Sequence, residues 1–178
     1  LLPPGPAISC ILRLMSSKRF ILFDHDGVLV ETEPWYYEAT RLAVELLGVD
    51  LDLAGYVQDM ATGGTAWEQA RARGASEDSI IRQRCWRNAR YQEFLQTKAI
   101  EIPGVSRTLM TLRTDYRMAI VTTARKADLA LIHADRDIVS HMDFVLANGD
   151  YARAKPAPDP YLAALERFGA TPEETLVV

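Results

Sequence analysis

Four short apolar runs, separated by segments with helical spacing, constrain the fold of this 178-residue chain. The runs lie near residues 20–24, 117–122, 143–147 and 174–178. A continuous apolar run of this length, without polar residues at every second position, is typical of a strand covered on both faces. Strands that alternate with helices favour β-α-β units. The sequence therefore predicts an α/β fold with a parallel sheet and helices on both faces.

One interval breaks this alternation. Roughly seventy residues of helical composition, with no strand, separate the first apolar run from the second. We expect helices over 34–47 and 77–97, with breaks at Gly55, Gly63-Gly64 and Gly74. Such an interval is too long for a simple crossover and indicates an inserted helical domain. The expected organisation is then a disordered leader, a core in two parts and a helical insert, with bounds 1–14, 15–33, 34–100 and 101–178.

Composition excludes several classes of protein. A net charge of −4 argues against nucleic acid as the main partner, and 48% hydrophobic residues exclude general disorder. Two cysteines and three histidines, without an HExxH pattern, provide neither a disulfide framework nor a typical zinc site. No apolar run is long enough to span a membrane, and the leader lacks the order of a signal peptide. We expect a cytoplasmic protein that is a monomer or a weak dimer.

The first chemical motif follows the first apolar run. Asp24 and Asp26 are separated by one residue and followed by Gly27. They lie at the carboxyl end of a buried strand, where open α/β sheets bind their ligands. Carboxylates this close repel each other, so a cation, a lysine or a shared proton must compensate. Alternatively, the segment is an ordinary turn with a solvated aspartate, because short motifs also occur by chance.

Two further motifs follow later strands. Thr122 and Thr123 end the second apolar run, where a hydroxyl can donate to a phosphate oxygen or cap a helix. Lys155 begins the segment KPAPDPY, whose prolines stiffen the backbone around it. A lysine held in this way can neutralise carboxylates and phosphate. Alternatively, it is a surface lysine in a proline-rich turn.

The order of these motifs is more specific than each motif alone. DxDGxLxxTE, a helical insert, an apolar strand ending in threonine and then KPxPDPY resembles the haloacid dehalogenase superfamily over about residues 18–178. The branch it resembles contains small phosphatases and β-phosphoglucomutase-like proteins with a helical cap. The resemblance implies a Rossmann-like core and an Mg²⁺-dependent phosphatase that forms a phosphoaspartate. Its substrate would be a small phosphorylated metabolite, such as a sugar phosphate or phosphoglycolate.

The resemblance also implies a role for each motif residue. Asp24 would be the nucleophile, and Asp26 the general acid and base. Thr122 would hold phosphoryl oxygens, with Thr123 beside it in the substrate site, and Lys155 would balance charge. Mg²⁺ would bind the Asp24 carboxylate, the Asp26 backbone carbonyl and an acidic fourth motif. His25 occupies the variable position of the first motif, and we interpret it as a packing residue.

The insert supplies further candidates. Between Thr65 and Ile100, seven basic residues outnumber four acidic ones, so a basic face could attract anionic substrates. We expect Arg87 and Arg84 to face the cleft when the cap closes, Arg87 to bind substrate, and Gly64 to belong to a loop at the site. The alternative is that these charges form only a solvated surface.

Two departures leave other functions open. β-Phosphoglucomutases carry a histidine shortly after the first motif, where this chain has Tyr36. This difference favours a phosphatase over the alternative of a phosphomutase. The fourth motif would lie beyond Val178, so the last part of the core is expected to be missing. A protein that ends there is expected to be a poor enzyme that tends to associate, or a non-catalytic protein that binds phosphate or metal.

Overall fold

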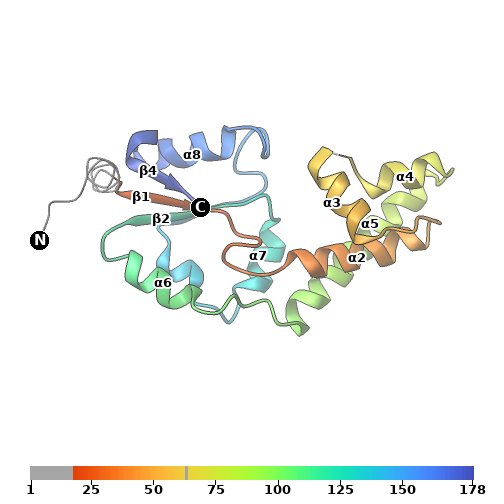
Figure 1. Cartoon of the computed structure of the whole chain (residues 1–178), viewed down its shortest axis with the longest axis horizontal. Helices are drawn as coiled ribbons and strands as arrows, with labels where there is room; N and C mark the ends of the chain where they lie inside the picture. The colour runs from red at the N-terminus through yellow and green to blue at the C-terminus, as the bar shows by residue number, and fades with distance from the viewer. Residues whose placement is uncertain (1–17, 63) are drawn as a thin grey trace, which may run out of the picture. The chain divides into compact units, whose positions relative to one another are not determined.

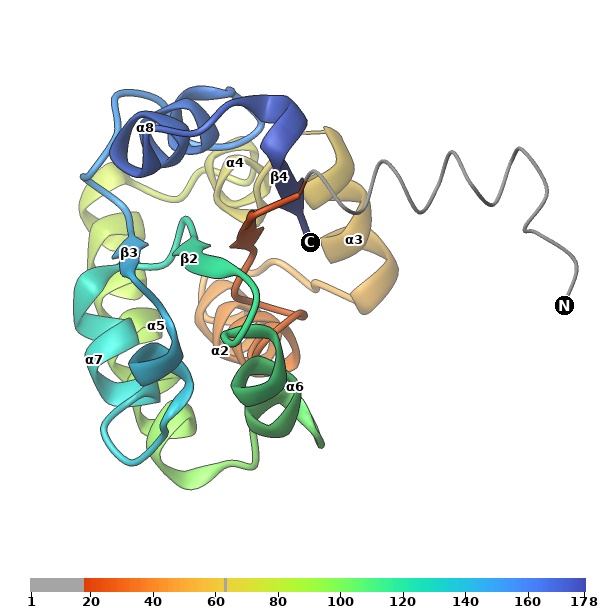
Figure 2. The same ribbon diagram turned by 90° about the vertical axis from the view of Figure 1, so that its left-hand side faces the viewer.

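The structure is a computed structural model that describes residues 18–62 and 64–178. The predicted leader, Cys10 and Gly63 lie outside these residues. Four strands form one parallel sheet in the order β3-β2-β1-β4 (Figures 1 and 2). The strands are β1 (Phe20–Phe23), β2 (Arg117–Val121), β3 (Phe144–Leu146) and β4 (Thr175–Val177). The predicted α/β fold is confirmed, and each strand falls within one of the four apolar runs.

The apolar runs form strands because both faces of the sheet are covered. All four residues of β1 are buried, and β1 lies between β2 and β4. On one face, Phe20 and Leu22 pack with residues of β2, β3 and helix α8 (Asp159–Phe168). The ring of Phe168 lies 4.9 Å from that of Phe20 and 4.6 Å from that of Phe144. This packing attaches α8 to the sheet.

The opposite face of the sheet is covered by two other helices. Figures 1 and 2 show α6 (Val105–Leu112) and α7 (Lys126–Ile132) on the side of the sheet away from α8. Leu109 of α6 and Ile132 of α7 are both buried. Two 3₁₀ turns, η1 (Ile138–His141) and η2 (Pro172–Glu174), precede β3 and β4. The predicted helices on both faces of the sheet are therefore present.

The chain divides into two compact units, and each is described by itself. The first, the core unit, contains residues up to Val30 and Glu101–Val178, and the second, the helical unit, contains Glu31–Ile100. The helical unit consists of α2 (Glu33–Glu45), α3 (Leu53–Thr62), α4 (Ala66–Ala72) and α5 (Glu77–Thr97). Within its described residues it has no strand. An inserted helical region therefore separates β1 from β2.

One detail of the helix prediction is wrong. The expected break at Gly55 does not occur, because Gly55 lies in the first turn of α3. Its backbone N–H donates to the Asp52 carboxylate at 2.7 Å. Glycine is unfavourable in the interior of a helix. In the first turn, however, the backbone N–H groups have no partner within the helix, and the Asp52 carboxylate accepts a hydrogen bond from one of them.

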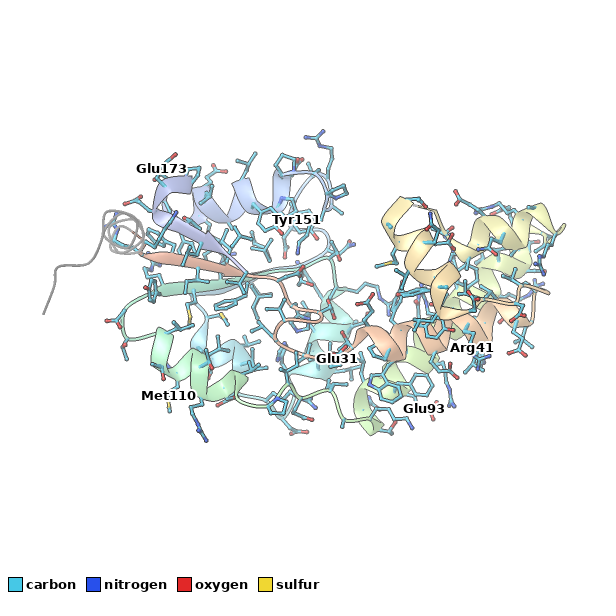
Figure 3. The ribbon with its side chains drawn as sticks, in the orientation of Figure 1. Glu31, Arg41, Glu93, Met110, Tyr151 and Glu173 are labelled. Atoms are coloured by element: carbon cyan, nitrogen blue, oxygen red, sulfur yellow. The ribbon has the colours of Figure 1, made fainter. Side chains whose placement is uncertain are left out.

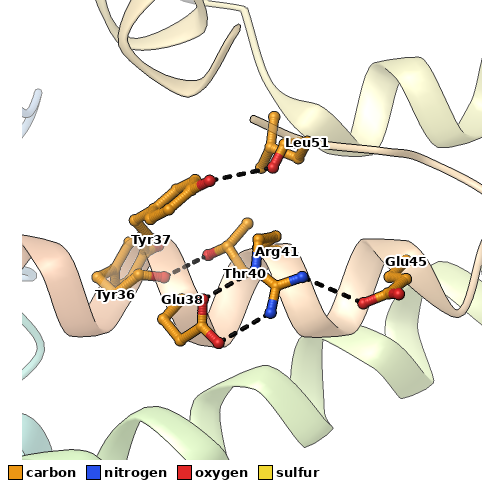
Figure 4. Close-up of polar contacts among 7 residues, drawn as sticks. All are labelled: Tyr36, Tyr37, Glu38, Thr40, Arg41, Glu45 and Leu51. Carbon is orange, nitrogen blue, oxygen red and sulfur yellow. Dashed lines mark hydrogen bonds and ion pairs between the residues drawn. The ribbon is translucent and has the colours of Figure 1, made fainter. Parts of the chain in front are cut away.

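Helix α2 carries a row of polar contacts, one of which joins it to the segment that follows (Figure 4). Arg41 forms ion pairs with Glu38 at 2.8 Å and with Glu45 at 3.3 Å along the helix surface. The Tyr37 hydroxyl donates to the Leu51 carbonyl at 3.2 Å. Beneath these contacts, Ala43 and Val44 are fully buried with Trp67 in the core of the helical unit. The helical unit therefore has an apolar core of its own.

The two ends of the helical unit are neighbours. Val30 and Glu101 form an antiparallel bridge, and the backbone N–H of Glu31 donates to the Ile100 carbonyl at 2.8 Å. The chain therefore leaves and re-enters the core unit through two paired segments. None of the helices in residues 18–62 and 64–178 has both the length and the apolar character of a membrane span.

Candidate active site

The candidate site lies at the carboxyl end of β1, where Asp24 directly follows the strand. Lys155 Nζ lies 2.8 Å from Asp24 Oδ1, and the His25 backbone N–H donates to the same oxygen at 2.7 Å. Within the described residues, both contacts to this carboxylate fall on Oδ1. The Asp24 side chain is 40% exposed, whereas that of Lys155 is only 18% exposed. The lysine thus neutralises a carboxylate that a ligand can still reach.

Asp26 lies beside Asp24 in the same motif. Its Oδ2 lies 3.4 Å from the Thr122 hydroxyl, and its Oδ1 lies 3.4 Å from His25 Nδ1. The following Gly27 has a positive φ of 76°, a conformation that disfavours other residues. This conformation turns the chain so that the Gly27 N–H donates to the Val30 carbonyl at 2.8 Å. The turn therefore holds Asp26 close to the end of β2.

Thr122 connects β2 to the site. Its side chain is buried, and its Oγ1 also accepts a hydrogen bond from the Ala124 N–H at 3.0 Å. Thr123 is exposed, and its side chain forms no hydrogen bond with any other described residue. The hydroxyl of Thr122 is thus oriented by both the backbone and Asp26, whereas that of Thr123 is open to solvent.

Tyr151 supports this site and was not predicted from the sequence. It lies on the loop that leads into α8 (Figure 3), and its hydroxyl donates to the Thr122 carbonyl at 2.7 Å. Burial raises the pKa of Tyr151, and the negative charges of Asp150 and Asp24 act in the same direction. The phenol therefore remains protonated and keeps its donor. No sequence motif pointed to this residue, because its partner is the backbone carbonyl of Thr122, 29 residues earlier in the chain.

The loop that carries Lys155 is tied to the start of α8. Arg153 donates two hydrogen bonds to Asp159, at 3.0 and 2.8 Å, across the intervening prolines. Lys155 Nζ also lies 5.4 Å from the centre of the Tyr161 ring, a distance at which the ring attracts an ammonium group. Tyr161 belongs to the predicted KPAPDPY motif, although no role was predicted for it. The loop and the helix together fix the position of the lysine.

Four predicted residues thus come together, in two pairs: Asp24 with Lys155 and Asp26 with Thr122. Within residues 18–62 and 64–178, no group of three or more His, Cys, Asp or Glu side chains is arranged to hold a metal ion. The oxygens of the DxD motif nevertheless suit Mg²⁺, which prefers hard oxygen ligands and needs few from the protein. The available donors are the Asp24 carboxylate and the Asp26 backbone carbonyl.

The other predicted residues belong to the helical unit. The Arg87 guanidinium lies 4.4 Å from the Tyr36 ring, and it donates to Thr40 Oγ1 at 3.3 Å and to Asn88 Oδ1 at 2.9 Å. Arg84 is exposed and lies 5.3 Å from the Trp67 ring. Arg87 is therefore held in place by residues of its own unit.

Gly64 is half-buried next to α3. A Cβ atom at this position would lie 3.3 Å from Asp59 Oδ1, a close but not prohibitive contact. The space around it therefore does not by itself require glycine.

Comparison with known proteins identifies the family. The model of the haloacid dehalogenase-like hydrolases matches residues 18–178. The chain belongs to this family. CbbY of Rhodobacter capsulatus is 29% identical to this haloacid dehalogenase-like hydrolase over 168 residues, which cover 88% of the chain and 74% of CbbY. A phosphorylated carbohydrates phosphatase of Thermotoga maritima is 24% identical over 164 residues, with the same shares covered.

Solved structures agree with this assignment. A predicted phosphoglycolate phosphatase of Haemophilus somnus superimposes with a TM-score of 0.78 at 22% identity, over 92% of this chain and 77% of that one. At this identity the likeness establishes the fold. The haloacid dehalogenase-like hydrolase therefore falls in the predicted branch, with phosphoglycolate phosphatases, CbbY proteins and β-phosphoglucomutase-like proteins.

Proposed function

We propose that this haloacid dehalogenase-like hydrolase is an Mg²⁺-dependent phosphatase of small phosphorylated metabolites and forms a phosphoaspartate on Asp24. The observation that carries the proposal is the convergence of Asp24, Lys155, Asp26 and Thr122 at one edge of the sheet. This set provides a nucleophile, a cation, a proton donor and a hydroxyl, which phosphoryl transfer requires in one place. Phosphorylated carbohydrates are the favoured substrate class, because one of the relatives carries that name.

In the first step, Asp24 Oδ2 attacks the phosphorus atom of the substrate. Oδ1 is occupied by Lys155 and the His25 N–H, so Oδ2 is the oxygen available for attack. The bond from phosphorus to the leaving oxygen breaks as the bond to Oδ2 forms. Protonated Asp26 gives its proton to the leaving oxygen, which departs as an alcohol. The Thr122 hydroxyl donates to a phosphoryl oxygen and helps to hold the group in line.

In the second step, water replaces the alcohol. The Asp26 carboxylate takes a proton from the water as its oxygen attacks the phosphorus atom of the phosphoaspartate. The bond to Oδ2 breaks, inorganic phosphate leaves, and Asp24 returns as a carboxylate beside Lys155. Asp26 ends the cycle protonated, so both residues are restored.

The Asp24 carboxylate and the Asp26 backbone carbonyl would hold the Mg²⁺ ion. When bound, the ion would neutralise charge on the phosphoryl oxygens. Lys155 contributes to the same purpose from the protein side. It is largely buried and pairs with Oδ1, so it places a positive charge beside two neighbouring acidic groups.

The test uses the full-length natural protein that contains this sequence. Phosphate release is measured for a panel of sugar phosphates and phosphoglycolate, with Mg²⁺ and with a chelator. We expect turnover that requires Mg²⁺, a phosphoenzyme trapped by acid quench, and the loss of both in Asp24→Asn. Glu173→Gln is the control, because this exposed carboxylate in η2 lies outside the site.

Other outcomes would assign another function. Wild-type turnover by Asp24→Asn would contradict the covalent mechanism. Transfer of the phosphoryl group to a second sugar position, in place of water, would indicate a phosphomutase. Binding of phosphate and Mg²⁺ without any turnover would indicate a non-catalytic binding protein.

For the helical unit, we propose that residues 34–100 act as a cap and that Arg87 binds the phosphorylated substrate. A guanidinium stacked on an aromatic ring keeps its charge and its planar donors in a fixed place, which suits an anionic ligand. We also propose that Gly64 and Thr123 belong to the substrate site. Residue Gly64 would allow close approach of the backbone, and Thr123 offers an exposed hydroxyl at the end of β2.

A further inference from the structure

Two histidines of the core unit, one buried and one half-buried, meet next to the candidate site. His25 Nε2 and His133 Nε2 are 2.9 Å apart, and the ring centres are 5.1 Å apart. The His25 side chain is completely buried. His133 is half-buried and follows the last residue of α7. These residues are 108 positions apart in the sequence, and both belong to the core unit.

The short contact determines where the protons lie. Of two ring nitrogens this close, one must donate a hydrogen and the other must accept it. Within the described residues, the Nδ1 atoms of both rings have no hydrogen-bond partner that meets normal geometry. However, His25 Nδ1 lies 3.4 Å from Asp26 Oδ1. When Asp26 is ionised, as it is after it has given its proton to the leaving oxygen, a lone pair facing its carboxylate oxygen is unfavourable, whereas an N–H facing it is favourable. His25 therefore carries its proton on Nδ1, and its Nε2 accepts.

This assignment defines the state of His133. Its Nε2 must carry the hydrogen that it donates to His25, and its Nδ1 must be unprotonated. Burial lowers the pKa of His133 to about 4, and the neighbouring His25 acts in the same direction. A neutral ring with a single proton agrees with this pattern.

We propose that His133 is a positioning residue, which fixes the tautomer of His25 so that the Nδ1–H of His25 holds the Asp26 carboxylate next to Thr122. The inference rests on the proposed role of Asp26 as general acid and base. A hydrogen bond that orients a catalytic group through its second nitrogen is a common device in enzymes. Here a second histidine, in place of a carboxylate or a carbonyl, provides that hydrogen bond.

The first readout is the tautomer itself. In ¹⁵N spectra of the protein near pH 7.5, we expect the Nδ1–H form for His25 and the Nε2–H form for His133. Single substitutions of the three histidines of this sequence assign the signals, and His141 is an internal reference. His133→Leu removes the donor, and the His25 signals should then change to a mixture of tautomers. His133→Gln keeps an amide donor at a similar reach and should restore the Nδ1–H form.

The second readout is activity in the full-length protein. We expect His133→Leu to lower kcat by about 10–100-fold with little change in KM, since Asp26 acts in the chemical step. His133→Gln should recover most of that loss. Ile132→Val is the matched control, because Ile132 is a fully buried residue of α7 that precedes His133 and has no group that can form a hydrogen bond with the pair. It should lower stability without changing kcat or the tautomer of His25.

Two results would overturn the inference: an Nε2–H tautomer of His25 in the wild-type protein, or an unchanged kcat in His133→Leu. If His133→Leu does not fold, the wild-type spectrum and His133→Gln still decide the matter. Asp26→Asn is measured in parallel. Full activity in Asp26→Asn would refute the proposed acid and base, and the positioning role with it, even where the spectra show the expected tautomers.

Discussion

At the scale of single residues, the site depends on two aspartates in different surroundings. Asp24 pairs with Lys155, whereas Asp26 lies between the Thr122 hydroxyl and the His25 ring. Lys155 places a positive charge beside Asp24, whereas the Thr122 hydroxyl and the His25 ring give Asp26 two groups that can form hydrogen bonds. The difference in surroundings therefore suits a nucleophile and a proton carrier.

Replacing Asp26 tests this division of roles. We expect Asp26→Asn to lower kcat by roughly 10²–10⁴-fold, because an amide cannot transfer the proton. The affinity for Mg²⁺ should change little, because the backbone carbonyl is the proposed ligand. Steady-state kinetics and metal titration measure the two effects. A large loss of Mg²⁺ affinity would show that the carboxylate itself binds the ion.

Arg87 offers a second test at this scale. If its guanidinium binds substrate, Arg87→Ala should raise KM for phosphorylated substrates, or lower kcat, while the circular dichroism spectrum remains unchanged. Arg82→Ala is a suitable control, because Arg82 is an exposed arginine on the same helix that donates to Ser79. Equal kinetic effects of the two substitutions would argue for a general effect of charge, without a specific contact.

At the scale of elements, α5 depends on its first turn. Ser76 precedes this 21-residue helix, and its hydroxyl accepts a hydrogen bond from the Ser79 N–H at 3.3 Å. Ser76→Ala leaves that N–H without its partner and should lower the free energy of unfolding by about 1 kcal/mol. Ser76→Asp keeps an acceptor and should retain the stability. Denaturant titration followed by circular dichroism compares the variants, and equal stability of Ser76→Ala and wild type would contradict the capping role.

The elements also show how far a sequence can be read. The strands could be predicted because burial on both faces leaves an unbroken apolar run, as in Phe20–Phe23. The bounds of α5, residues 77–97, were also predicted correctly, whereas the break at Gly55 was not. Glycine reliably predicts a helix break only where no side chain accepts hydrogen bonds from the neighbouring backbone N–H groups. At Gly55, Asp52 does so.

The same limits apply to the prediction of the candidate site from the sequence. Asp24, Asp26, Thr122 and Lys155 could be selected because each occurs in a motif at the end of a strand. The contact of His25 with His133 could not, since it depends on where α7 ends beside β1. His25 was predicted to pack, and its burial agrees with that. The hydrogen bond of its ring is set by the tertiary fold, and no local pattern records it.

At the scale of the whole molecule, stability should depend on pH through His133. Its pKa is lowered to about 4 in the folded protein, compared with 6.5 for an ordinary histidine. Between these values the unfolded chain binds a proton that the folded protein does not bind. The free energy of unfolding should therefore fall as the pH decreases from about 6.5 to about 4, by on the order of 2 kcal/mol for a half-exposed group.

Denaturant titrations at several pH values measure this dependence. His133→Gln has no titrating ring at this position and should show a smaller slope in the same pH range. His141, at the end of η1, is a useful comparison, because its ring lies 3.4 Å from the Asp137 carboxylate and not beside a second histidine. An identical slope in wild type and His133→Gln would show that other groups cause the dependence.

The pairing of Val30 with Glu101, and of Glu31 with Ile100, has a consequence for how such chains can evolve. The two ends of the inserted seventy residues lie next to each other, as the two ends of a short turn do. The path of the chain in the core unit is therefore the same as if a turn joined these two segments. Replacing the inserted region by a longer or shorter one therefore leaves every strand of the sheet in its position. Selection can therefore remodel the region proposed to choose the substrate while the aspartates, the threonine and the lysine keep their places. One candidate site can in this way be combined with many specificities by exchange of a single inserted region.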